Sequence, residues 1–106
     1  MLFYRVGVFE MIYSDKLFRA KNGFIHRKIA NQDVLISVGS GIADFNGYIL
    51  LNSTASFLWD MLKEERSIQE LSEAVAHEFE VSPEEAKTDV TEFILMLVDK
   101  GMLEEN

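Results

Sequence analysis

Two helix-start signals in the second half of the chain constrain the fold that it can adopt. Ser67 is followed three residues later by Glu70, and Ser82 is followed by Pro83 and then Glu85. In a capping box, the serine side chain accepts the backbone N–H of the residue three positions on, and the acidic side chain of that residue accepts the backbone N–H of the serine. Proline is also favoured at the first helical position. The sequence therefore predicts one helix beginning after Ser67 and another after Ser82.

A third start signal, Asn52 or Ser53, precedes the other two in the sequence. Apolar residues recur at helical spacing after each of the three signals. Gly101 is the expected end of the third helix. The predicted apolar faces are Ala55, Leu58, Trp59 and Leu62 in the first helix, Ile68, Leu71, Val75 and Phe79 in the second, and Ala86, Val90, Phe93 and Leu97 in the third. The third helix is also apolar nearly all round from Phe93 to Val98, which is more apolar surface than one core needs.

The first half of the chain predicts strands. Phe24 to Ala30 and Val34 to Val38 form the expected antiparallel hairpin, with Phe24, His26 and Lys28 on one face. Tyr48 to Leu51 is a third strand that leads directly into the first helix. These elements predict an α+β domain, winged-helix-like, with a three-stranded antiparallel sheet followed by a three-helix bundle. We expect residues 21–106 to form this domain and residues 1–20 to be an N-terminal apolar extension.

Charge is distributed unevenly along the chain, which has a net charge of −8. Residues 1–51 contain six Lys or Arg and four Asp or Glu, whereas residues 52–106 contain four and fourteen. Such an acidic helical body disfavours nucleic acid, because duplex affinity depends on neutralised phosphates. No segment has the roughly 20 apolar residues of a membrane span, and the first residues lack a signal-peptide pattern. We therefore expect a cytoplasmic protein that does not contact a membrane.

Patterns typical of an enzyme are absent from the sequence. There is no cysteine, and the two histidines, His26 and His77, are far apart, which is a poor start for a metal site. Gly39-Ser40-Gly41 lacks the lysine and the following helix of a phosphate-binding loop. We predict no catalysis, no cofactor and no metal, and we expect both histidines to be surface or part-buried side chains.

Two features favour binding instead. The third strand, Tyr48 to Leu51, is expected at a sheet edge, and neither charge nor proline protects it from pairing with another chain. Such an edge is typical of sites where an extended peptide adds as a strand. The surplus apolar surface of the third helix, which includes the adaptable Met96, is a second candidate contact surface.

Residues about 21–104 resemble the pyrroloquinoline-quinone synthesis protein D (PqqD) family, whose domain is the RiPP recognition element. The resemblance extends over most of the chain in the same order. The matching residues are Asp44-Phe45-Asn46-Gly47, Leu51-Asn52-Ser53-Thr54-Ala55, Phe57, Leu58, Trp59, Leu62, Ser67, Ile68, Glu70, Leu71, Phe79, Val81, Ala86, Asp89, Val90, Phe93, and Leu97 to Gly101-Met102-Leu103.

This resemblance implies a non-catalytic chaperone for peptides. In the family, the leader of a ribosomally made precursor peptide adds as a strand and is presented to a modifying enzyme, often a radical S-adenosylmethionine (SAM) enzyme. The implied peptide-binding residues are Tyr48, Ile49, Leu50 and Leu51 on the strand, and Asp89, Glu92, Phe93, Met96 and Lys100 on the third helix. The implied partners are therefore a precursor peptide and a modifying enzyme.

Two alternatives remain open from the sequence. The helix-turn-helix spacing around Glu80 and Val81 is also found in DNA-binding regulators, although residues 82–106 contain two Lys and seven Asp or Glu. The apolar N-terminal residues 1–18 are instead compatible with a structural domain that forms a homodimer through them.

Overall fold

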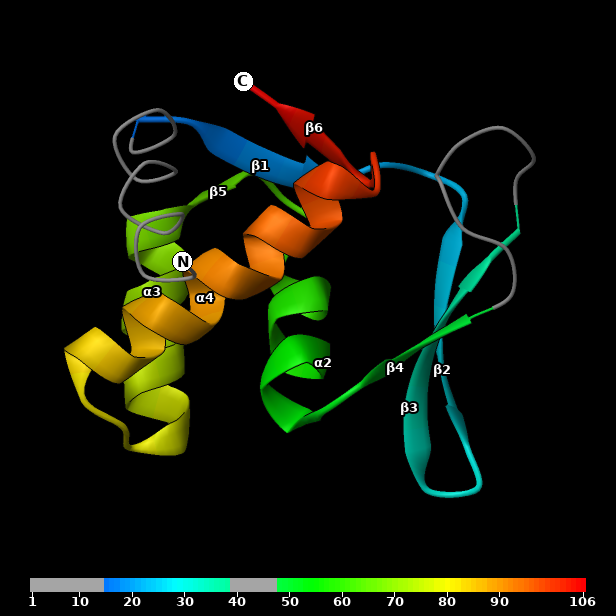
Figure 1. The fold of residues 1–106 in the computed structure, drawn as a ribbon, viewed down its shortest axis with the longest axis horizontal. Helices are drawn as coiled ribbons and strands as arrows, with labels where there is room; N and C mark the ends of the chain where they lie inside the picture. The colour runs from blue at the N-terminus through cyan, green and yellow to red at the C-terminus, as the bar shows by residue number, and fades with distance from the viewer. Residues whose placement is uncertain (1–14, 39–47) are drawn as a thin grey trace.

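The computed structural model describes residues 15–38 and 48–106, which form an α+β fold of helices and short antiparallel strands (Figure 1). The predicted fold class is therefore confirmed, whereas the winged-helix assignment stays a prediction. Asp44-Phe45-Asn46-Gly47, which carry part of the family resemblance, and the apolar residues 1–14 lie outside the described residues. The elements in chain order are β1 (Leu17–Ala20), β2 (Phe24–Ile29), β3 (Gln32–Ser37), β4 (Tyr48–Leu51), α2 (Ser53–Met61), β5 (Arg66–Ser67), α3 (Ile68–Phe79), α4 (Pro83–Asp99) and β6 (Leu103–Glu105).

The predicted sheet has the strand order β2-β3-β4, and both of its strand pairs are antiparallel. β2 and β3 are joined by only two residues, Ala30 and Asn31, whose φ angles are 51° and 67°. Positive φ at both central residues is the geometry that matches the twist of a two-residue hairpin. This tight turn is why β2 ends at Ile29 and β3 begins at Gln32, earlier than the hydrophobic pattern alone predicted.

A second sheet, with the order β5-β1-β6, was not predicted. It lies across one end of the helices, away from the β2–β3–β4 sheet (Figure 1). β1 pairs with β5 and with the C-terminal β6, and its Phe18 side chain is fully buried in the core. Residues 17–20 thus contribute a strand and a core side chain, although they fall within the predicted extension. The predicted boundary between residues 20 and 21 stays a prediction.

The helix starts are where the sequence predicted them. The side chains of Asn52, Ser67 and Ser82 accept the backbone N–H groups of the third residue after each, at 2.8, 3.0 and 3.1 Å. At Ser67 the Glu70 carboxylate also accepts the backbone N–H of Ser67, so this capping box is complete. At Ser82 the structure has the first of these two bonds, so the second predicted box is half formed. Gly101 follows α4 with φ 70°, as a residue that ends a helix commonly does.

One face of the β2–β3–β4 sheet packs against α2. Leu35 and Leu51 are buried there, and the Phe24 ring meets Trp59 edge-on at 5.8 Å between ring centroids. The same face carries His26, as the alternation along β2 predicted. Packing against α2 therefore fixes how the sheet lies relative to the helices.

On α4 the buried side chains differ from the predicted face. Ile94 and Thr91 are fully buried, whereas Phe93 is only partly buried. Ala86, Val90 and Leu97 are buried as predicted. Because successive helical residues are about 100° apart, burying Ile94 turns Phe93 to the side of the helix rather than into the core.

Candidate functional site

β4 leaves one of its edges open. It pairs with β3 along its whole length, from Tyr48 opposite Ile36 to Leu51 opposite Asp33. On its other side, no strand among the described residues pairs with it, since β4 stands at the end of its sheet. An edge strand of this kind presents backbone N–H and C=O groups that another extended chain can bind.

The four side chains of β4 are divided between two faces. Leu51 is buried and Ile49 packs against the core, whereas Tyr48 and Leu50 are 64% and 58% exposed. The exposed pair borders an apolar hollow of about 450 Å³ on the sheet face opposite α2. The other residues that line this hollow are Ile29, Gln32, Val34 and Ile36. The four predicted strand residues therefore share an open backbone edge but not a common side-chain pocket.

A groove of about 290 Å³ runs between α2 and α4. Four of the five residues predicted on the third helix line it together, namely Asp89, Glu92, Phe93 and Met96. The fifth, Lys100, is the half-buried residue that ends α4 and does not line this groove. The α2 side of the groove, which the sequence did not predict, consists of Asn52, Thr54, Ala55 and Leu58.

The groove and the open edge of β4 meet at one residue. Asn52 follows β4 directly, caps α2 and lines the groove. Figure 1 shows β4 running straight into the start of α2 at this point. The groove combines apolar side chains such as Leu58 and Phe93 with the carboxylates of Asp89 and Glu92, and none of the described residues that line it is Lys or Arg. It is suited to apolar groups accompanied by positive charge.

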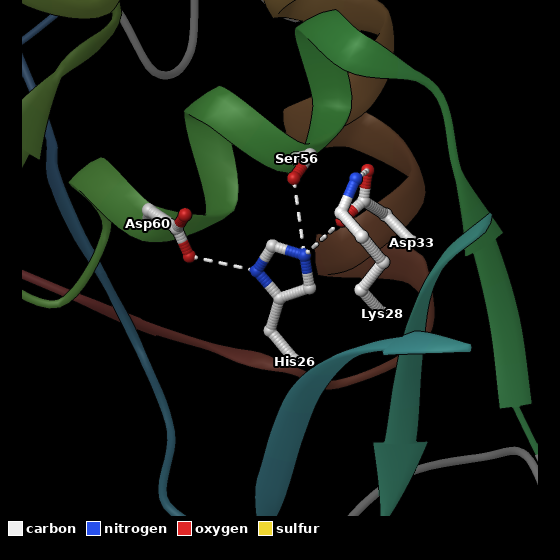
Figure 2. Close-up of polar contacts among 5 residues, drawn as sticks. All are labelled: His26, Lys28, Asp33, Ser56 and Asp60. Carbon is white, nitrogen blue, oxygen red and sulfur yellow. Dashed lines mark hydrogen bonds and ion pairs between the residues drawn. The ribbon is translucent and has the colours of Figure 1, made fainter. Parts of the chain in front are cut away.

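A second polar cluster joins the sheet to α2 around His26 (Figure 2). The His26 Nδ1 lies 2.9 Å from Asp60 Oδ1, and its Nε2 lies 2.9 Å from Asp33 Oδ1 and 3.1 Å from Ser56 Oγ. Asp60 and Ser56 are on α2, Asp33 is on β3, and Lys28 Nζ lies 3.7 Å from Asp33 Oδ2. From the sequence, His26 was expected to be a surface or part-buried side chain, and none of these partners was predicted.

Ser56, His26 and Asp60 have the connectivity of a catalytic triad, but a fourth group, the Asp33 carboxylate, also contacts the ring. A general base must hold a free nitrogen toward the serine hydroxyl. Here the Asp33 carboxylate also lies at Nε2, and a carboxylate can only accept, so the contacts to both carboxylates form together when both ring nitrogens carry protons. In this form the imidazolium cannot take a proton from Ser56, and the cluster is a structural contact between elements.

The pKa values of the cluster agree with this protonation. Burial of the His26 ring lowers its pKa, but hydrogen bonds to Asp60 and Asp33 and attraction to both carboxylates outweigh burial and raise the pKa above its ordinary value. The hydrogen bond from His26, helped by the charge of Lys28, lowers the pKa of Asp33 in spite of partial desolvation. Both shifts favour the charged pair.

The described residues form neither a metal-binding cluster nor a membrane-spanning helix. Across residues 15–38 and 48–106, no cluster of three or more His, Asp or Glu side chains is placed to hold a metal ion. None of the helices in these ranges combines the length and the apolar character needed to cross a membrane.

The sequence family called Coenzyme PQQ synthesis protein D (PqqD) matches residues 33–103, which is more than half of the chain. The chain belongs to the PqqD family. The match covers β4, α2 and α4, and so includes both the open edge and the groove. No curated protein matches the chain.

Solved structures share the fold of this PqqD-family chain. Lasso peptide synthetase B1 complexed with the leader peptide is 24% identical, with a TM-score of 0.63, over 82% of this chain and 96% of that one. TbiB1 in complex with the TbiA(beta) leader peptide is 23% identical, with a TM-score of 0.63, over 81% and 94%. The PqqD truncation of Methylobacterium extorquens PqqCD, described as a stand-alone RiPP recognition element, is 16% identical, with a TM-score of 0.64, over 83% and 88%.

Proposed function

We propose that this PqqD-family protein binds the leader of a ribosomally made precursor peptide and presents it to a modifying enzyme. The observation that carries the proposal is the open edge of β4, which ends at Asn52 beside the groove between α2 and α4. Membership of the PqqD family supports it. Two of the similar structures are complexes with leader peptides, and this also supports the proposal.

In this proposal the leader adds as a strand along Tyr48–Leu51. Backbone hydrogen bonds supply a sequence-independent part of the affinity, and side-chain pockets supply selectivity. Side chains of the guest strand that point toward the helices enter the groove, where Phe93 and Met96 contact apolar groups. Tyr48 and Leu50 lie on the opposite face and contact alternate side chains of the guest.

The remaining partners and the cellular setting are part of the same proposal. A radical SAM enzyme is the candidate for the modifying enzyme that receives the leader. The protein acts in the cytoplasm without a membrane or nucleic acid, consistent with fourteen acidic residues between residues 52 and 106. A homodimer through residues 1–18 stays a separate prediction, because residues 1–14 are outside the described part.

The direct test is a titration of the isotope-labelled protein with the leader encoded by a neighbouring open reading frame. We expect the largest amide shifts at Tyr48–Leu51 and at residues 89–96 of α4, because these form the edge and the groove. Amides of α3, which contributes no groove residue, are the internal control. Saturating leader that shifts neither β4 nor α4 would rule the proposal out.

The carboxylates in the groove predict the charge of the ligand. We expect the leader segment that enters the groove to carry Lys or Arg. The double substitution Asp89→Asn and Glu92→Gln should weaken binding by about three- to tenfold, because partly exposed charge pairs contribute roughly 0.2–1 kcal/mol each. It should also flatten the salt dependence of the affinity. Calorimetric titrations at low and high salt measure both effects.

A matched control removes the same charge elsewhere. Glu78→Gln with Glu105→Gln neutralises two exposed carboxylates that do not line the groove. This double variant should bind the leader like the unsubstituted protein at each salt concentration. Equal weakening by the two double variants would mean that only the overall charge matters, and the predicted ligand charge would then be wrong.

A further inference from the structure

The ring of His26 spans the boundary between the β2–β3–β4 sheet and α2. From β2 it reaches Asp60 and Ser56 of α2 through its two different nitrogens, and it contacts Asp33 of β3 as well (Figure 2). These bonds join residues 34, 30 and 7 positions apart in the sequence. The apolar part of the same boundary is formed by residues such as Phe24 and Trp59. His26 therefore adds a directional polar contact to a boundary where apolar side chains also pack.

All of these contacts can form together only when the ring is protonated. In the imidazolium, Nδ1–H donates to Asp60, and Nε2–H donates to Asp33 and is shared with the Ser56 hydroxyl. A neutral ring has one N–H. With that proton on Nδ1, the bond to Asp60 remains and Ser56 can donate its hydroxyl proton to Nε2. The Asp33 carboxylate then faces a nitrogen lone pair and loses its donor.

We propose that His26 is a positioning residue whose protonation fixes the β4 edge relative to the α2–α4 groove. Asp33 is the register partner of Leu51, at the end of β4 where the strand enters α2. Loss of the His26–Asp33 bond thus breaks the side-chain link that runs from β3 through His26 to Asp60 and Ser56 of α2, beside the point where the edge and the groove meet. The link to peptide binding rests on the proposed function, whereas the loosening itself does not.

The charges that face the ring define the pH range. Among the described residues these are Asp33 from β3, Asp60 from α2 and Lys28 from β2. Because the pKa of His26 is raised in the folded state, the stability that protonated His26 gives to the fold is complete below about pH 6.5. It is lost as the pH rises through the folded-state pKa. Because the pKa of Asp33 is lowered, its contribution is present above about pH 4 and is lost as the pH falls through its folded-state pKa. The contact is strongest between these limits.

The first measurement follows the two ring nitrogens of His26 by NMR while the pH is raised, with a His77→Gln variant to assign the signals. We expect an imidazolium that persists above the ordinary histidine range and then a neutral ring protonated at Nδ1. Asp33→Asn should lower the midpoint of this titration. A ring already neutral at pH 6, or a neutral form protonated at Nε2, would overturn the proposal.

The second measurement compares amide hydrogen exchange in β2 and β3 with that in α3 on both sides of this titration. After correction for the intrinsic pH dependence of exchange, protection of the sheet should fall by about tenfold on deprotonation, which corresponds to one charge-assisted hydrogen bond. Protection of α3 should not change. In His26→Gln, which cannot titrate, the pH-dependent change should disappear. The same change in that variant would refute the assignment to His26.

Leader binding separates this inference from the proposed function. With the encoded leader, we expect affinity to fall as His26 deprotonates in the unsubstituted protein and to vary less with pH in His26→Gln. If the leader binds equally well at both pH values although the sheet loosens, the positioning role is wrong and the proposed function stands. If the leader does not bind at any pH, the proposed function fails, and the two protein-only measurements still decide the role of His26 in the fold.

Discussion

A proline placed at the open edge of β4 is expected to reduce leader affinity at least about tenfold while the protein stays folded. Successive backbone amides of a strand point to opposite sides, so of the neighbouring Ile49 and Leu50 one amide faces β3 and the other faces the open edge. Proline removes an N–H and is tolerated on the free side of an edge strand. At the outward amide it removes one ladder bond, worth roughly 1 kcal/mol, and its ring obstructs a guest backbone.

The two proline variants control for each other. Hydrogen exchange of the free protein identifies the β3-facing amide, which should be the slowly exchanging one. Proline at that position should destabilise the sheet, and proline at its neighbour should leave the sheet stable. Leu50→Thr keeps the N–H and changes only an exposed side chain that contacts the guest, so it should weaken leader binding less than the outward proline does. A folded outward-proline variant that binds the leader with unchanged affinity would show that the leader does not pair with β4.

Phe18→Ala is expected to lower the free energy of unfolding by about 3–5 kcal/mol. The Phe18 side chain is fully buried in the main core, although it lies in the segment that the sequence analysis assigned to an N-terminal apolar extension. Truncating the ring removes apolar contacts and leaves a cavity that the surrounding side chains can fill only in part. Urea unfolding at neutral pH measures the effect, with the slope compared between variants to confirm that the unfolding transition is unchanged.

Arg19→Ala is the matched control on the same strand. The Arg19 guanidinium lies 2.8 Å from the Glu104 carboxylate, but both side chains are about half exposed. Such exposed pairs contribute at most about 1 kcal/mol, so this variant should remain close to the unsubstituted protein in stability. If Phe18→Ala proved no more destabilising than Arg19→Ala, β1 would not be an integral part of the core.

The elements that the sequence predicted well are those specified by neighbouring residues. Ser67 and Glu70 form the complete capping box, and Tyr48–Leu51 has the predicted bounds. Of the residues predicted on the third helix, Asp89, Glu92, Phe93 and Met96 line one groove and Lys100 lies outside it, and their role in peptide binding stays a prediction. Ala55 and Leu58 were visible as part of an apolar helix face, but nothing local indicated that this side of α2 would line the groove.

The tertiary structure decided what depends on residues far apart in sequence. The second sheet joins strands of two to four residues, too short to give a hydrophobic period. The bond between Arg19 and Glu104 spans 85 positions, and the one between His26 and Asp60 spans 34. By itself the sequence determined where the helices begin and that Tyr48–Leu51 is an edge strand. Helix caps and the alternation of apolar and polar residues in strands each depend on only a few neighbouring residues. Which face of α2 meets His26, and whether Phe93 or Ile94 enters the core, follows from packing between elements, which no local pattern encodes.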